Sequence, residues 1–252
     1  MNLTFDLALV ETVMLAACRI AAFLVIAPPF AHRAVPGTVK AMLSVGLALA
    51  VAPRLPVRAA DTTMVFLGDV ALQVIIGAAM GFLVYLVFSA VQSAGSVIDL
   101  FGGFQMAQAF DPMSMTSGAQ FGRLYQMPAI VLLFVSDGYQ IVVVGLARSF
   151  DALPVGQGFN LALVGESVTS GLTDMFVGAL QIAGPLVVVL FLADVGLGLL
   201  TRAAPAMNAF ALGFPLKILM TISMIGFTLL ALPRIVSALA DESFTTMLGV
   251  TS

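Results

Sequence analysis

The chain has 252 residues, of which 61% are hydrophobic and only 9% are charged, and its formal net charge is −3. Its mean hydropathy is +1.12. Soluble domains carry about 25% charged residues, so this composition excludes a surface that lies mostly in water, and we expect an integral membrane protein. The few charges are scattered and form no basic stretch of the kind that binds nucleic acid, so we expect no nucleic-acid partner.

Six apolar segments follow one another along the chain, at residues 7–30, 38–53, 64–98, 127–147, 175–200 and 208–235. Each is long enough, or nearly so, for the helix of about 20 residues that crosses a bilayer. The second segment is short. The third is too long for one crossing, so we expect it to continue beyond the hydrocarbon or to bend near Gly95. The two-residue alternation of a β-barrel is absent. The pattern predicts an all-α membrane protein of about six long apolar helices.

The segments are separated by stretches that interrupt helices. Prolines lie together at residues 27–37 and 52–58, and a proline and two glycines interrupt the chain at 150–160. Proline removes a backbone hydrogen-bond donor and ends or kinks a helix. The sequence TRAAP at 201–205 predicts a tight connection between two helices. Because no repeat or low-complexity tail is present, we expect a single domain over residues 1–252.

Three charged residues, Arg19, Asp194 and Lys217, lie inside apolar segments. A charge at the centre of a bilayer costs about 3 kcal/mol, so each should be paired or should face water or protein. If the last two segments form an antiparallel hairpin, Asp194 and Lys217 approach the same depth and are candidates for a buried ion pair. Two alternatives stay open. Lys217 could extend to the membrane surface while Asp194 bonds to backbone or to a neighbouring subunit, or Asp194 could take part in a proton relay.

Gly77 and Gly81 form a small-xxx-small pattern within the third segment. Such a pattern lets a second helix approach closely, so both glycines are candidates for helix packing, within the chain or against a partner. Pro185 and Pro215 lie inside later segments and predict bent packing helices.

The sequence holds no catalytic or cofactor-binding pattern. One cysteine, Cys18, and one histidine, His32, exclude a thiolate or histidine-rich metal site within the chain. The acidic residues are dispersed, and phosphate-binding or dinucleotide-binding glycine motifs are absent. We therefore expect no enzymatic activity, no cofactor and no metal.

The stretch FGGFQMAQAFDPMSMTSG, residues 101–118, is rich in methionine and glycine and almost free of charge. Methionine adapts to irregular surfaces, phenylalanine adds bulk, and glycine lets the backbone rearrange. The residues with these properties are Gly102, Gly103, Phe104, Met106, Phe110, Met113, Met115 and Gly118. Composition alone leaves two interpretations open: a segment that seals an apolar constriction by excluding water, or an interfacial loop that packs on lipid or protein.

Three parts of the sequence together resemble a known family. They are RIAAFLVIAPPFAHRAVPGTVKAMLSVGLALAVAP at 19–53, AGSVIDLFGGFQMAQAFDP at 94–112 and GLGLLTRAAPAMNAFALGFPLKI at 196–218. Along nearly its whole length the chain is similar to the FliR proteins of the flagellar type III protein-export apparatus. Their injectisome counterparts are the SctT proteins.

The resemblance implies a subunit of the export gate in the bacterial inner membrane, at the flagellar basal body. It implies helices in tilted hairpins that pack with FliP-like and FliQ-like subunits in a helical assembly around a conduit. FlhB-like and FlhA-like membrane proteins would be neighbours, unfolded proteins would be the substrates, and membrane lipid would surround the complex. The resemblance also implies that the 101–118 loop projects into the conduit and plugs it.

Two other functions stay open besides the flagellar one. The chain could be the SctT-type subunit of a virulence injectisome, since one sequence does not fix which secretion machine it serves. A small-molecule permease is suggested by Asp194, Lys217 and the interrupted helices. A scaffold without a role in lining the conduit is a further alternative.

Overall fold

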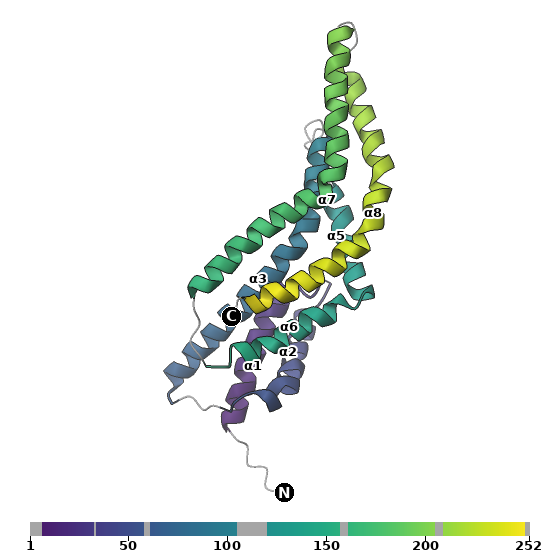
Figure 1. Ribbon diagram of the computed structural model, residues 1–252. Coiled ribbons are helices and arrows are strands. Elements are labelled where there is room, and N and C mark those ends of the chain that lie inside the picture. The colour runs from purple at the N-terminus through teal and green to yellow at the C-terminus, as the bar shows by residue number, and fades with distance from the viewer. Residues whose placement is uncertain are drawn as a thin grey trace, which may run out of the picture. The chain divides into compact units, whose positions relative to one another are not determined.

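The computed structural model describes residues 7–32, 34–57, 61–104, 120–156, 161–204 and 209–249, and within these ranges every regular element is a helix (Figure 1). The elements are α1 (Leu7–Ile26), α2 (Gly37–Val51), a short 3₁₀ helix (Ala52–Arg54), α3 (Thr63–Gly102), α5 (Gln120–Val135), α6 (Gly138–Ala152), α7 (Leu161–Ala203) and α8 (Ala209–Gly249). The predicted all-α membrane class is confirmed.

Four of the described helices are long and apolar enough to cross a membrane, namely α1, α3, α7 and α8, and the bent pair α5 and α6 makes a fifth if it counts as one span. The sequence had suggested about six. Helix α2 has only 15 residues, which is short of the roughly 20 needed for a crossing.

The segment expected at residues 127–147 is two helices instead of one. Helix α5 ends at Val135, and Asp137 adopts a left-handed conformation with φ 57° and ψ 13° before α6 begins at Gly138. A left-handed residue cannot continue a right-handed helix, and asparagine and aspartate tolerate this conformation better than most residues. The Ser136-Asp137-Gly138 turn therefore interrupts an otherwise apolar run.

The three longest helices extend well beyond the length of one crossing. Helices α3, α7 and α8 have 40, 43 and 41 residues, and at about 1.5 Å per residue each is roughly 60 Å long. Helix α3 runs through Gly95 without a break, so the predicted continuation beyond one crossing is confirmed, and the bend near Gly95 stays a prediction. Helix α7 begins at Leu161, well before the expected 175, because Glu166 and Asp174 lower the hydropathy of its first turns without interrupting the helix.

The chain divides into two compact units, which are described separately. Unit 1 comprises residues Met1–Val87, Asp137–Leu172 and Ala238–Ser252, and unit 2 comprises Phe88–Ser136 and Thr173–Ser237. Helices α3, α7 and α8 contribute residues to both. The single domain expected over residues 1–252 stays a prediction.

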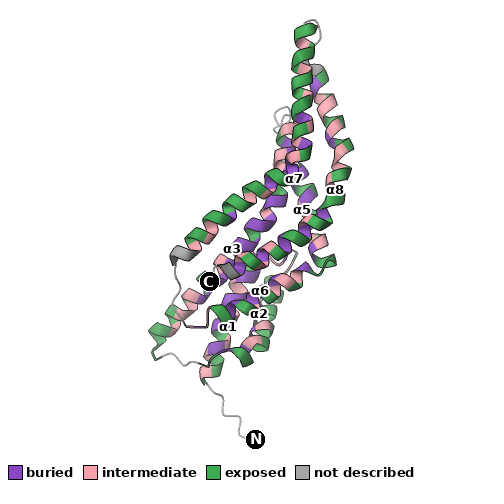
Figure 2. Ribbon diagram, viewed as in Figure 1, coloured by how far each residue is buried: buried purple, intermediate pink, exposed green. Residues whose placement is uncertain are grey.

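The core of unit 1 is built mainly from α1 and the first part of α3. In Figure 1, α1 and α2 lie side by side. The faces of α1 and α3 that meet are buried (Figure 2) and carry Ala16, Ile20 and Phe23 on α1 and Met80 and Leu83 on α3.

Unit 2 contains the end of α3, helix α5, and a hairpin formed by the later part of α7 and the earlier part of α8 (Figure 1). Its buried side chains include Ile98, Tyr125, Leu133 and Leu186. The hydroxyl groups of Tyr125 and Thr228 are hydrogen-bonded to each other between α5 and α8.

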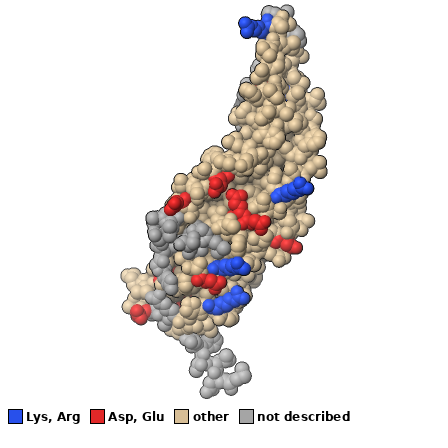
Figure 3. All heavy atoms as spheres, in the orientation of Figure 1, with Lys and Arg blue, Asp and Glu red and all other residues tan. Residues whose placement is uncertain are grey.

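Large apolar side chains cover the outside of the α7–α8 hairpin. They include Phe191, Leu192, Leu199, Phe227 and Leu230, each more than half exposed. The visible surface of the hairpin is almost entirely uncharged (Figure 3). An apolar surface of this extent suits contact with lipid or with other protein subunits, and does not suit water.

Candidate functional site

The candidate sealing segment begins where α3 ends, and the structure describes only its first residues. Gly102, Gly103 and Phe104 are described. The other candidates, Met106, Phe110, Met113, Met115 and Gly118, lie outside the described residues, as does the rest of 105–119.

The two glycines at the end of α3 occupy positions where a side chain would not fit easily. Gly103 has φ +79°, a left-handed conformation that favours glycine, and a Cβ atom there would lie 3.0 Å from the ring of Phe214. A Cβ atom on Gly102 would lie 3.0 Å from the Thr221 hydroxyl oxygen and from the ring of Phe104. Glycine therefore lets the chain leave α3 sharply while it stays in contact with α8.

Residues on either side of the 105–119 stretch touch each other. The ring of Phe104, before it, packs edge-to-face on the ring of Phe121, after it, with 4.8 Å between the ring centroids and 74° between the planes. This is a favoured geometry for aromatic pairs. The contact brings the end of α3 and the first turn of α5 together.

Asp99, on the last turn of α3, fixes the same junction with hydrogen bonds. Its side chain is 1% exposed, and its Oδ2 atom accepts hydrogen bonds from the backbone N–H groups of Phe121 at 2.9 Å and Gly122 at 3.4 Å. The first N–H groups of a helix have no partner within the helix and carry partial positive charge, so a carboxylate suits this position. Asp99 therefore caps α5 from a different helix.

Gly95 allows the two backbones to approach closely at this junction. A Cβ atom on Gly95 would lie 2.5 Å from the carbonyl oxygen of Phe121 and 2.6 Å from the Cα atom of Gly122. Only glycine permits such a separation. Sequence reasoning singled out neither role: it considered Gly95 as a bend, and Asp99 follows directly after the predicted 64–98 segment, where a charge is unremarkable.

The two candidates for an ion pair lie together. The Nζ atom of Lys217 on α8 is 2.7 Å from Oδ1 of Asp194 on α7. The pair lies at the surface of the single chain, since the Lys217 side chain is 19% exposed and the Asp194 side chain 45% exposed. Burial of this pair would therefore have to come from lipid or from another subunit.

The two candidate packing glycines both face α1. A Cβ atom on Gly77 would clash with the backbone of Arg19, approaching its carbonyl carbon to 2.9 Å. A Cβ atom on Gly81 would lie 3.0 Å from the carbonyl oxygen of Phe23. The small-xxx-small pattern thus lies where α1 and α3 come closest within unit 1.

Arg19 is fully buried in unit 1, with an exposure of 0%. Its Nε atom donates to Oε1 of Gln73 at 2.7 Å. Its Nη1 atom donates to the carbonyl oxygen of Ser149 at 3.2 Å and lies 3.3 Å from the Ser149 hydroxyl. Its Nη2 atom donates to the carbonyl oxygen of Leu153 at 2.8 Å. The guanidinium carbon lies 4.2 Å from the centroid of the Phe150 ring.

These partners neutralise the charge of Arg19 without an acidic residue. Within the part of the chain that the structure describes, no carboxylate pairs with it. Ser149 and Leu153 are at the C-terminal end of α6, where backbone carbonyls carry partial negative charge. The Ser149 carbonyl oxygen also accepts the N–H group of Leu153, whereas the Leu153 carbonyl lies past the last turn and has no partner within the helix. The sequence marked Arg19 as needing a partner, and its partners were not identifiable because they lie 54 to 134 residues away.

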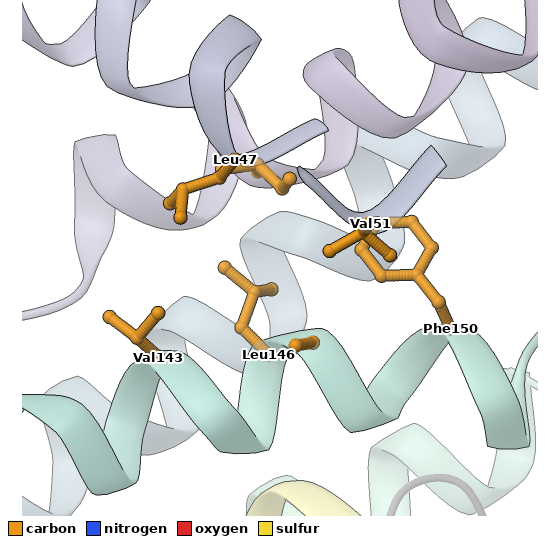
Figure 4. A pocket seen from close by; sticks show the side chains of 7 residues that line it. Leu47, Val51, Val143, Leu146 and Phe150 are labelled. Carbon is orange, nitrogen blue, oxygen red and sulfur yellow. The ribbon is translucent and has the colours of Figure 1, made fainter. Parts of the chain in front are cut away.

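A small pocket lies between α2 and α6, next to Phe150. Figure 4 shows Leu47 and Val51 facing Val143, Leu146 and Phe150 across it, and Ile20 and Ala147 complete the lining. Its volume is about 20 Å³, room for roughly one water molecule. All seven lining side chains are apolar, so the pocket offers nothing to orient a substrate. Among the described residues, no three His, Cys, Asp or Glu side chains are grouped to hold a metal ion.

The comparisons with known proteins agree with the resemblance found in the sequence. The family described as bacterial export proteins, family 1, matches residues 10–243. The chain is 30% identical over 235 residues to the flagellar biosynthetic protein FliR of Escherichia coli (strain K12), and the match covers 93% of this chain and 90% of that protein. It is 33% identical over 232 residues to the protein of the same name from Pectobacterium carotovorum subsp. carotovorum, covering 90% and 87%.

Injectisome proteins are also similar to the chain, over a shorter stretch. The secretion system apparatus protein SsaT of Salmonella typhimurium is 30% identical over 154 residues, which cover 60% of this chain and 59% of that protein. The similarity to the FliR proteins is therefore the more extensive of the two. Since the family match and the FliR similarity both extend along nearly the whole sequence, the chain belongs to the bacterial export proteins of family 1.

Proposed function

We propose that this chain is a core subunit of the flagellar type III protein export gate, where it helps to form and seal the conduit for unfolded export substrates and so supports flagellum assembly. The observation that carries the proposal is the match to the export family over residues 10–243 together with similarity to FliR proteins over about nine tenths of the chain. In this role the chain is not an enzyme and needs no cofactor.

The sealing element of the proposal is the segment that begins at Gly102. Its methionines, Met106, Met113 and Met115, have unbranched, polarizable side chains that can close an irregular opening. An apolar constriction excludes water and ions by dewetting. The junction at the base of the segment supports the proposal, because the left-handed Gly103 and the packing of Phe104 on Phe121 hold its two ends together.

The proposed surroundings are other helical membrane proteins. The exposed apolar face of the α7–α8 hairpin suits contact with FliP-like and FliQ-like subunits and with lipid of the bacterial inner membrane. Asp194, which is 45% exposed in the single chain, has room to accept a further hydrogen bond from a neighbouring subunit. FlhB-like and FlhA-like proteins are the other proposed neighbours in the flagellar basal body.

The equivalent role in a virulence injectisome is the second candidate, because SsaT is also similar to the chain. The extent of the similarity favours the flagellar role, since it covers 93% of the chain for FliR and 60% for SsaT. Genes for flagellar or injectisome subunits next to this one would separate the two directly.

Deletion of the gene in its own bacterium tests the proposed machine. We expect the deletion strain to lose motility and to export no hook or filament protein, and the intact gene to restore both. Unchanged motility and export would overturn the flagellar role. Co-purification of the tagged chain with FliP-like and FliQ-like subunits tests the proposed partners.

A second experiment tests sealing. Removal of residues 106–115 should raise ion leakage across the membrane of cells that assemble the complex. A matched pair of variants separates apolar sealing from loop length: Met106, Met113 and Met115 changed together to Leu should keep the seal, whereas the same three changed to Ser should leak. If leakage stays at the wild-type level in the deletion and in the Ser variant, the segment does not seal the gate.

A further inference from the structure

The junction between α3 and α5 contains a buried charge that packing alone does not require. Among the described residues of unit 2, Asp99 is the one acidic residue that is buried, with an exposure of 1%. Only Oδ2 is hydrogen-bonded, to the N–H groups of Phe121 and Gly122, and Oδ1 is buried without a hydrogen-bond partner in the described part of the chain.

A carboxylate in this state is costly. Burial removes its hydration, and hydrogen bonds to one oxygen atom offset only part of the free energy that is lost. An apolar residue would fill the same space without that loss. What Asp99 supplies and an apolar residue cannot is an acceptor for two N–H groups at the positive end of α5. The role of Asp99 at this position is therefore to accept hydrogen bonds from the first N–H groups of α5, and not to fill space.

The bond to Phe121 connects residues 22 positions apart in the sequence. The two bonded residues lie on either side of residues 105–119 in the sequence. Gly95 lies against Phe121 and Gly122, and Phe104 packs on Phe121, but these are packing contacts that tolerate small shifts. The hydrogen bonds of Asp99 fix both the distance and the direction of the first turn of α5 relative to the last turns of α3.

We propose that Asp99 is a positioning residue of the export gate: by capping α5 from α3, it fixes the point at which the chain re-enters the fold after the candidate sealing segment. This inference rests on the proposed function. Without the cap, the first turn of α5 loses its acceptor and frays.

Amide hydrogen exchange in the purified export complex tests the contact itself. In the Asp99→Ala variant, exchange at Phe121 and Gly122 should become about fivefold faster, the effect of losing an average helix cap. Asp99→Asn keeps an acceptor oxygen without the charge and should give an intermediate rate. Ser96→Ala is the matched control, since Ser96 lies one turn away on α3 and, among the described residues, its hydroxyl bonds to the carbonyl oxygen of Gln92 on its own helix. Unchanged exchange in Asp99→Ala would overturn the proposal.

Ion leakage separates a positioning role in the gate from simple structural support. Asp99→Ala should raise leakage at least severalfold in cells that contain a normal amount of assembled complex, Asp99→Asn should recover most of the seal, and Ser96→Ala should match the wild type. Should Asp99→Ala fail to assemble, the comparison of Asp99→Asn with Ser96→Ala carries the test, with a smaller increase expected in the former.

The deletion of residues 106–115 distinguishes failure of this inference from failure of the proposed function. If the deletion leaks and both Asp99 variants stay tight, the segment seals the gate and Asp99 does not position it, so the inference is overturned alone. If the deletion does not leak, the sealing role itself fails, and the assignment of Asp99 to the gate falls with it.

Discussion

Replacement of Arg19 by Met should destabilise unit 1, although it removes a charge from an apolar interior. Arg19 has no carboxylate partner among the described residues, so a purely coulombic view would expect the neutral variant to be more stable. The structure indicates the opposite, because the guanidinium group donates hydrogen bonds to Gln73 on α3 and to the carbonyl oxygen of Leu153 at the end of α6.

The magnitude follows from what each partner retains. The carbonyl oxygen of Ser149 still accepts the N–H group of Leu153 at 2.9 Å. Gln73 Oε1 and the carbonyl oxygen of Leu153 lose the donors that they have. Two unpaired acceptors cost about 2–6 kcal/mol together, and the lost contact with Phe150 adds about 1 kcal/mol. Removal of the charge returns about 3 kcal/mol, so we expect a net loss of roughly 2 kcal/mol.

A double-mutant cycle with Gln73→Leu cancels the free-energy cost of burying the Arg19 charge, because Arg19→Met removes that cost in both backgrounds. Each single variant leaves one member of the Arg19–Gln73 hydrogen bond without its partner, whereas the double variant removes both members. The Leu153 carbonyl oxygen loses its donor in Arg19→Met and in the double variant alike, so its cost cancels. We therefore expect a coupling free energy of about 2–3 kcal/mol. The assay is equilibrium unfolding of the detergent-solubilised protein. Arg148→Met is the control, since the exposed Arg148 lies 5.4 Å from the ring centroid of Phe244 and should contribute less than about 1 kcal/mol.

A coupling free energy below about 0.5 kcal/mol would refute this reasoning, because it would mean that Gln73 finds another partner when Arg19 is absent. The Nε2 atom of Gln73 is already buried without a hydrogen-bond partner in the described residues. The side chain is therefore poorly placed to find one.

Three further predictions concern single positions. Gly77→Ala should destabilise the protein by about 1–3 kcal/mol, because its Cβ atom meets the α1 backbone, whereas Gly68→Ala, with open space around it, should be neutral or stabilising by up to about 1 kcal/mol in the same unfolding assay. Gly95→Ala should speed amide exchange at the start of α5, and an unchanged rate would contradict the close approach. Asp194→Asn and Lys217→Met should each lower the amount of membrane-inserted protein more than the double variant does, since each single change leaves one charge unpaired. A blot of membrane fractions measures these amounts. Equal amounts in all three variants would mean that the ion pair contributes nothing.

Hydropathy was sufficient to predict the helical membrane fold and most of the helices, because apolar runs of this length have few alternatives in lipid. It could not predict the boundary at Asp137, which depends on backbone conformation rather than on polarity, although Ser-Asp-Gly is a recognisable turn signal. It also placed the start of α7 too late, because the charges of Glu166 and Asp174 in the first turns of the helix do not prevent helix formation.

The site was predictable where the relevant partners are close in the sequence. Spacing pointed to the approach of Asp194 and Lys217 across one hairpin, and it marked Gly77 as a packing position without identifying α1 as the neighbour. The contacts of Arg19 and Asp99 depend on helix ends that are distant in the sequence, so no local pattern could reveal them.

Arg19 and Asp99 share a physical solution that explains why neither needs an opposite charge. Arg19 binds carbonyl oxygens at the C-terminal end of α6, and Asp99 binds N–H groups at the N-terminal end of α5. Each charge has the sign that the helix dipole favours at that end. Each also binds backbone groups that the helix itself leaves unpaired, namely the Leu153 carbonyl oxygen for Arg19 and the Phe121 and Gly122 N–H groups for Asp99. In a chain this apolar, an isolated charged residue therefore indicates a helix end to be capped at least as strongly as it indicates an ion pair.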